Sequence, residues 1–66
     1  MDFAVVMEFA LRKQRLIYWL NLGVVIKEEW DNMIAEANRL GFESSKAQLQ
    51  RYYDHYGIGN LATHLN

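Results

Sequence analysis

The chain contains no cysteine and no proline, and each absence narrows what the protein can be. Without cysteine it forms neither disulfides nor thiolate metal sites, and it suits a reducing compartment, so we expect a cytoplasmic protein. Without proline, glycine is the strongest local signal for the end of a helix. The four glycines stand at positions 23, 41, 57 and 59 and leave segments of helical length between them. We therefore expect an all-helical chain.

An excess of charge of one sign is also lacking. Seven Lys or Arg residues face eight Asp or Glu residues, for a formal net charge of −1. Such a balance supplies no overall positive field to attract nucleic acid or an anionic membrane. Asp2 and Glu8 stand where a secretory signal needs basic residues. Residues 12–15, Arg-Lys-Gln-Arg, interrupt the apolar first segment. No run of about 18 apolar residues is therefore present, and we expect no membrane span.

What the chain has in abundance is apolar side chains, because 52% of its 66 residues are hydrophobic and 14% are aromatic. A chain of this length makes one small domain, residues 1–66, whose core buries only about 60% of the surface that the unfolded chain exposes. With no disulfide or metal to add stability, association with another chain is the remaining way to bury more apolar surface. We therefore expect a homodimer.

Hydrophobic periodicity between the glycines predicts helices over residues 3–22, 27–40 and 45–55, and a short helical turn over 60–65. Gly23 and Gly41 are expected to close the first two helices in left-handed caps, and Ser44 or Ser45 to begin the third. The fold class expected is all-α: an antiparallel helical hairpin, a third helix and a short C-terminal turn, assembled into a dimeric helical bundle.

Charge placement supports the expected hairpin. Folding about Gly23 places side by side those residues whose numbers sum to roughly 47. Three such pairs have opposite charges: Glu8 with Arg39, Arg12 with Glu36, and Arg15 with Asp31. Ion pairs at a surface are each worth only about 0–1 kcal/mol, so they select the register of the hairpin more than they stabilise it.

The first predicted helix carries two apolar stripes. The wider one is expected to be the core of the domain, and it consists of Phe3, Val6, Met7, Ala10, Leu11, Ile17 and Tyr18. The narrower one lies well round the helix, and one copy of the fold leaves it without a role. We expect it to form a protein interface together with the neighbouring tryptophan: Val5, Phe9, Leu16, Trp19 and Leu20.

The sequence contains no catalytic, cofactor or metal motif. His55 and His64 are the only imidazoles, and they belong to no metal-ligand spacing. Asp54 adjoins His55, but neighbours in sequence point to different sides of a helix. We therefore expect no enzyme, no cofactor and no metal site, because nothing in the pattern brings reactive groups together.

These features favour a small interaction protein that acts as a regulator, adaptor or inhibitor by docking a helical face onto another protein. Its small size would suit a gene of a phage or plasmid. An alternative comes from residues 34–53, IAEANRLGFESSKAQLQRYY, which resemble a helix-turn-helix. The DNA contacts in that alternative are Ser45, Lys46, Gln48, Gln50 and Arg51. A weaker third alternative is an amphipathic membrane-surface protein, for which only Arg12, Lys13 and Arg15 supply a basic rim.

Overall fold

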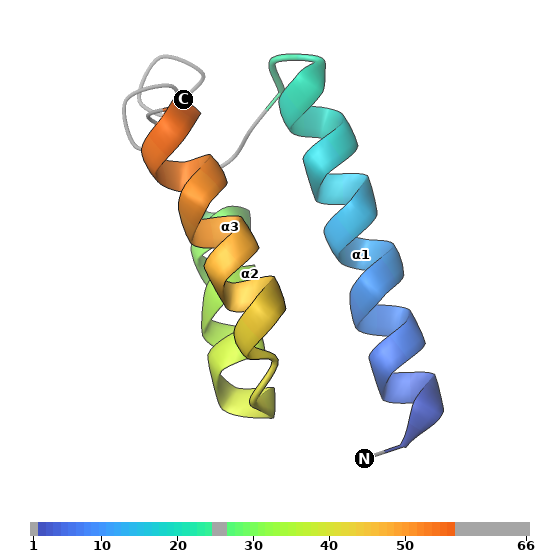
Figure 1. Ribbon diagram of the computed structural model, residues 1–66. Helices are drawn as coiled ribbons and strands as arrows, with labels where there is room; N and C mark the ends of the chain where they lie inside the picture. The colour runs from blue at the N-terminus through green and yellow to red at the C-terminus, as the bar shows by residue number, and fades with distance from the viewer. Residues whose placement is uncertain (1, 25–26, 57–66) are drawn as a thin grey trace.

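The computed structural model describes residues 2–24 and 27–56, which form three helices (Figure 1). They are α1 (Phe3–Asn21), α2 (Lys27–Leu40) and α3 (Glu43–Tyr56), and the prediction of an all-α fold is confirmed. The helices run alternately up and down, so that α2 is antiparallel to both of its neighbours (Figure 1). The helical turn expected over 60–65, and residues 25 and 26 of the first connection, lie outside the described residues.

Both ends of α1 are capped as the sequence indicates. At the start, the Asp2 side chain accepts a hydrogen bond from the backbone N–H of Ala4 at 3.1 Å. At the end, Gly23 has a φ of 77°, a conformation that side chains with a Cβ rarely adopt. Its N–H donates to the Leu20 carbonyl, and the N–H of Val24 donates to the Trp19 carbonyl, both at 2.9 Å. This pair of bonds is the Schellman arrangement, which satisfies carbonyls that would otherwise lack partners.

A second turn of the same kind joins α2 to α3. Gly41 also has a φ of 77°, and the N–H of Phe42 donates to the Ala37 carbonyl at 2.9 Å. The helix resumes at once, because the Phe42 carbonyl accepts a hydrogen bond from Lys46 N–H at 2.9 Å. The third helix therefore begins at Glu43, two residues before the predicted start, and the prediction that Ser44 or Ser45 caps it is wrong.

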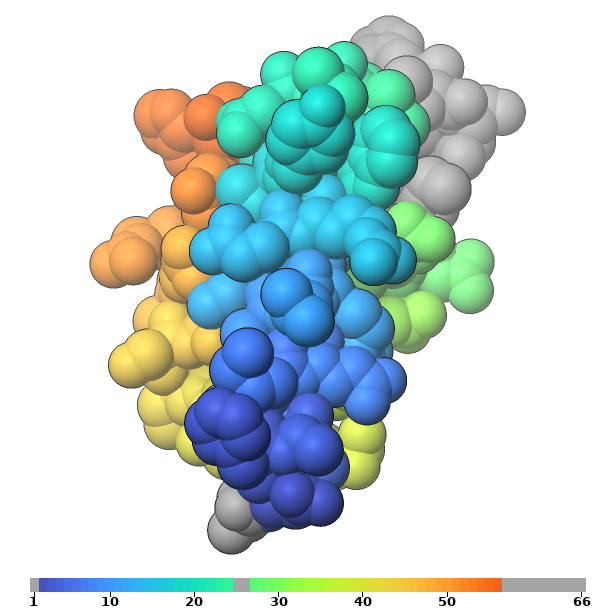
Figure 2. Space-filling model, turned by 90° about the vertical axis from the view of Figure 1, so that its right-hand side faces the viewer, coloured from blue at the N-terminus to red at the C-terminus, as the bar shows by residue number. Residues whose placement is uncertain are grey.

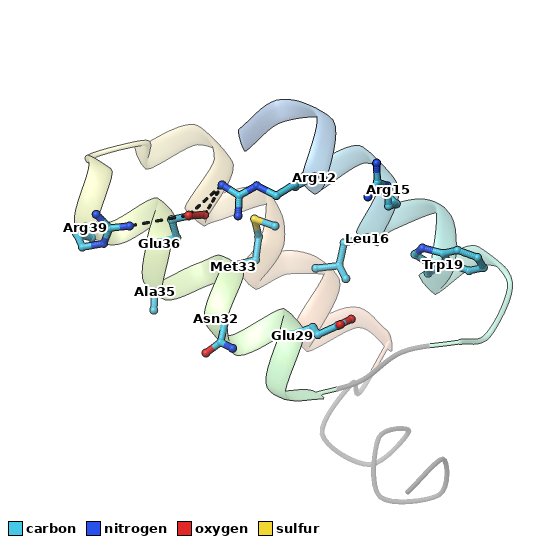
Figure 3. A pocket seen from close by; sticks show the side chains of 10 residues that line it. All are labelled: Arg12, Arg15, Leu16, Trp19, Glu29, Asn32, Met33, Ala35, Glu36 and Arg39. Carbon is cyan, nitrogen blue, oxygen red and sulfur yellow. Dashed lines mark hydrogen bonds and ion pairs between the residues drawn. The ribbon is translucent and has the colours of Figure 1, made fainter. Parts of the chain in front are cut away.

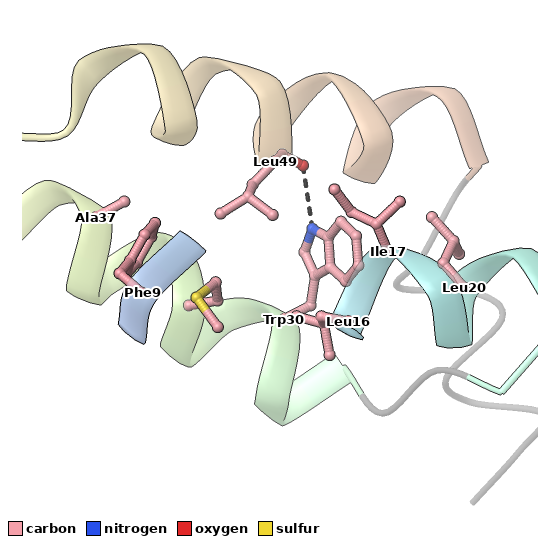
Figure 4. Close-up of a cluster of buried hydrophobic side chains, with 8 residues drawn as sticks. Phe9, Leu16, Ile17, Leu20, Trp30, Ala37 and Leu49 are labelled. Atoms are coloured by element: carbon pink, nitrogen blue, oxygen red, sulfur yellow. Dashed lines mark hydrogen bonds between the residues drawn. The ribbon is translucent and has the colours of Figure 1, made fainter. Parts of the chain in front are cut away.

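The core lies where the three helices face one another (Figure 4). Eight side chains are buried in it: Phe9, Leu16, Ile17, Leu20, Trp30, Met33, Ala37 and Leu49. Trp30 and Leu49 are fully buried, and the indole N–H of Trp30 donates to the Leu49 carbonyl at 3.0 Å. The two helices α2 and α3 approach each other most closely along the backbone, and α1 adds its side chains to the core from outside that pair.

One of the three predicted ion pairs is present. Arg12 of α1 lies 2.7 Å from Glu36 of α2, which confirms the antiparallel register of the hairpin. Asp31 binds Lys27 at 2.6 Å instead of Arg15, and Arg39 lies 3.9 Å from Glu36 on its own helix instead of beside Glu8. The local pairs win because residues three or four apart on one helix meet without any long-range placement.

Candidate interaction surface

The face that α1 turns toward the core is the opposite of the predicted one. Of the seven residues in the wider stripe, only Ile17 is buried, whereas Phe3, Leu11 and Tyr18 are 75%, 61% and 59% exposed. The narrower stripe supplies the core, with Phe9 at 2% exposure. The rings of Phe9 and Phe42 meet edge to face, with 5.0 Å between their centroids. This contact and the Arg12–Glu36 ion pair together turn the narrower stripe of α1 toward the core.

Because the narrower stripe faces the core, most of the predicted interface is buried within the single chain. Phe9, Leu16 and Leu20 are buried within the single chain, so they are not available at its surface. Val5 and Trp19 are 38% and 42% exposed. The two exposed residues do not form a continuous apolar surface by themselves, and the apolar residues open to a partner lie on the other side of α1.

That other side carries a line of exposed apolar side chains, here called the outer stripe: Phe3, Met7, Leu11, Tyr18 and Leu22. Their spacing of four, four, seven and four residues keeps them on one side of the helix, with Leu22 at its C-cap. The line extends over about 28 Å at a rise of 1.5 Å per residue. Figure 2 shows α1 running the full height of this face, with α2 and α3 at its two sides.

Three polar residues accompany the outer stripe. Gln14 stands in the gap between Leu11 and Tyr18 and is exposed. Glu8 and Arg15 lie together along one edge, seven residues apart and both exposed. Neither of these two charges takes part in an ion pair within residues 2–24 and 27–56. An unpaired acid and an unpaired base therefore border one apolar line.

A groove of about 600 Å³ separates α1 from α2 on the neighbouring side (Figure 3). Leu16 and Met33 point toward each other within it, Trp19 closes one end, and Arg12, Glu36 and Arg39 stand at the other. The pKa of Arg12 is raised above its ordinary value, chiefly by the side-chain hydrogen bond to Glu36 at 2.9 Å. Arg15 and Glu29 also line the groove, so it presents charges of both signs to a ligand.

A second ion pair lies at the start of α2. Lys27 has a raised pKa, first of all because its ammonium group donates a hydrogen bond to Asp31 at 2.6 Å.

Within the described part of the chain, no three His, Cys, Asp or Glu residues gather in a way that would hold a metal ion. None of the described helices has both the length and the apolar character needed to cross a bilayer.

The residues assigned to DNA in the alternative prediction lie on α3. Ser45 accepts a hydrogen bond from Lys13 at 3.2 Å, and Lys46 donates one to Asn38 at 2.8 Å, so both serve contacts between helices. Gln48 is partly buried, and only Gln50 and Arg51 are exposed. The antiparallel packing of α2 and α3 (Figure 1) also differs from a helix-turn-helix, whose two helices cross at about 90–120°. DNA binding by these residues stays a prediction without geometric support.

No protein-family model, no curated protein and no solved structure matches the chain. Its function must therefore be inferred from its own surface. The signal for the outer stripe was present in the sequence, because Gln14 stands in the middle of the wider apolar stripe, where a core position would be apolar. The narrower stripe has no polar residue within it, which is the pattern of a buried face.

Proposed function

We propose that this protein is a non-enzymatic interaction module that docks the outer face of α1 onto a protein partner. The observation that carries the proposal is the outer stripe itself, five large apolar side chains between 44% and 75% exposed on a helix whose opposite face already fills the core. At about 150–250 Å² for each aromatic side chain and towards the lower end of that range for Met and Leu, they leave on the order of 500 Å² of apolar surface open to water. A patch of this size is at the upper end for a monomer and is often functional.

The arrangement suits recognition between helices. A partner groove binds a docked helix through side chains three, four and seven residues apart, and the residues of the outer stripe are four and seven residues apart. Two of its five members, Phe3 and Tyr18, are aromatic. Tyrosine is among the residue types enriched where binding free energy is concentrated, and Tyr18 lies within the stripe rather than at its end. Glu8 and Arg15 along one edge provide the polar rim that accompanies such an apolar centre.

A role as regulator, adaptor or inhibitor follows from docking of this kind, because such proteins act by occupying a surface. The short α2–α3 hairpin then serves as a support. It buries the inner face of α1 and holds the helix straight, so that the outer stripe is preorganised before the partner arrives.

The proposal is tested by photo-crosslinking of the full chain. A photoreactive phenylalanine analogue replaces Leu11, at the centre of the outer stripe, and the chain is illuminated in an extract of cells that express it, with and without nuclease. The matched control carries the same analogue at Gln50, which is exposed on α3. We expect protein adducts, to this chain or to another, from position 11 that survive nuclease and that position 50 does not give.

Two results would contradict the proposal. Equal adduct patterns from positions 11 and 50 would show that the outer stripe has no preferred protein partner. Loss of the position 11 adducts on nuclease treatment would show that nucleic acid mediates the contact.

A further inference from the structure

Four of the five residues of the outer stripe are placed symmetrically about its centre. Its residue numbers pair off to a constant sum of 25, as Phe3 with Leu22 and Met7 with Tyr18. Leu11 gives the same sum with Gln14, which fills the central gap. Two helices packed antiparallel bring residues of constant sum to the same height along the axis. We infer that the partner docked on the outer stripe is a second copy of this chain, related by a twofold axis perpendicular to α1. This inference rests on the proposed function.

Charge complementarity selects the antiparallel orientation. Glu8 and Arg15 lie on the same edge of the stripe. Their residue numbers sum to 23, whereas residues that lie level in the antiparallel pair sum to 25, so Glu8 of one copy is two residues from being level with Arg15 of the other. Two positions correspond to about 3 Å along a helix, which long side chains span. Each chain's Glu8 therefore meets the Arg15 of the other copy, and the twofold axis makes this contact twice. In a parallel pair the charged edges of the two copies would lie on opposite sides of the seam, and Glu8 of one copy would not meet Arg15 of the other.

Gln14 fits the same axis. The residue numbers of the two copies of Gln14 sum to 28, three more than the constant sum of 25. The two side chains therefore lie about 4.5 Å apart along the helices, on either side of the twofold axis, where their amides can hydrogen-bond to each other. A single polar residue in an apolar seam lowers stability but fixes the register and orientation of paired helices. Gln14, the polar residue in the central gap of the stripe, thus stands where it would specify this particular pairing.

The area is sufficient for a dimer. Two outer stripes together bury on the order of 1,000 Å² of apolar surface, the size that a biological interface should reach, before Glu8, Gln14 and Arg15 add their own contributions. A chain of 66 residues without cysteine is also the kind that gains most from a partner, since its own core is small.

The first experiment measures association of the full chain by sedimentation equilibrium between about 1 and 100 μM, the range in which modest dimers are detected. Glu8→Arg and Arg15→Glu are each expected to raise the dissociation constant about tenfold, because each turns two attractions into two repulsions. The double variant Glu8→Arg with Arg15→Glu exchanges the charges and should restore wild-type association. The control Asp54→Arg makes the same reversal on the exposed part of α3 and should change nothing.

The second experiment reads the orientation with cysteines, for which the cysteine-free chain gives a clean background. A Met7→Cys chain and a Tyr18→Cys chain, distinguished by a mass label, are mixed and oxidised. An antiparallel dimer gives the mixed disulfide. The two positions lie eleven residues apart, about 16 Å along α1, so disulfides between like chains should be scarce.

Each remaining outcome decides the question. A wild-type chain that is monomeric at 100 μM, or a dimer that forms disulfides between like chains in preference to mixed ones, overturns the inference. In either case the proposed function still stands if Leu11 crosslinks to a different protein. A monomer that sediments with phosphatidylserine vesicles, and loses this property on Leu11→Asp, would assign the stripe to a lipid surface and overturn both.

Discussion

The two tryptophans offer the sharpest test of which face of the chain is buried. Trp30 is fully buried, whereas Trp19 is 42% exposed, so the same substitution to phenylalanine probes two very different surroundings. At Trp30 it removes the indole N–H that donates to the Leu49 carbonyl at 3.0 Å. At Trp19 it shortens a side chain that borders the groove between α1 and α2.

The expected loss of stability in Trp30→Phe is the sum of a lost hydrogen bond and a small cavity. The hydrogen bond contributes about 1 kcal/mol net, and no carbonyl is left unpaired because Leu49 keeps its bond within α3. The smaller ring leaves space beside Leu49 and Tyr52, whose own ring lies 6.1 Å from that of Trp30, and costs about 1–2 kcal/mol more. We expect Trp30→Phe to lower the free energy of unfolding by about 2–3 kcal/mol, and Trp19→Phe by at most about 0.5–1 kcal/mol.

The assay is urea unfolding followed by circular dichroism at one fixed protein concentration, because association would make stability depend on concentration. A domain of this size holds only about 3–5 kcal/mol in total, so Trp30→Phe should remove about half of it. In a thermal scan the loss corresponds to a fall of roughly 10 °C or more in Tm. Equal costs at the two positions, or a larger cost at Trp19, would refute the placement of α1 against α2 and α3.

Three further predictions concern the contacts between and at the ends of the helices. A double-mutant cycle with Arg12→Met and Glu36→Gln should give a coupling energy below about 1 kcal/mol that declines in 1 M salt, because the Arg12 side chain is 42% exposed and solvent screens the pair. Gly41→Ala should lower the free energy of unfolding by about 1–2 kcal/mol. No atom lies within 4 Å of the added Cβ, so the cost comes from the backbone, whose φ is 77°. A D-residue prefers that φ, so D-alanine in a synthetic chain should not carry this backbone cost. Asp2→Ala should lower it by about 1 kcal/mol and fray the start of α1, as amide hydrogen exchange would detect.

The helix bounds followed closely from local signals. Gly23 and Gly41 end their helices in left-handed caps because the chain has to leave a helix in that conformation, and glycine adopts it at little cost. Asp2 begins α1 for an equally local reason. The start of α3 was misplaced because serine is a common N-cap, while the turn after Gly41 leaves only Phe42 before the next helix.

The orientation of α1 could not be read from its residues with the same certainty. A hydrophobic pattern shows that a helix is apolar on two sides, but it does not show which side meets the rest of the chain. That choice depended on contacts far away in sequence, those of Phe9 with Phe42 and of Arg12 with Glu36. The predicted interface failed at Phe9, Leu16 and Leu20 for this single reason.

The sequence by itself therefore determined the number of helices over 3–56, their ends apart from the start of α3, and the fact that α1 has more apolar surface than one small core can take up. These properties depend on neighbours within a few residues along the chain. Gln14 was the one hint in the sequence that the wider stripe is exposed, and the tertiary structure decided that the outer stripe remains exposed, with Glu8 and Arg15 in no ion pair of the described residues. Burial is a property of packing between distant segments, and packing selected the narrower stripe because it joins α1 to both α2 and α3.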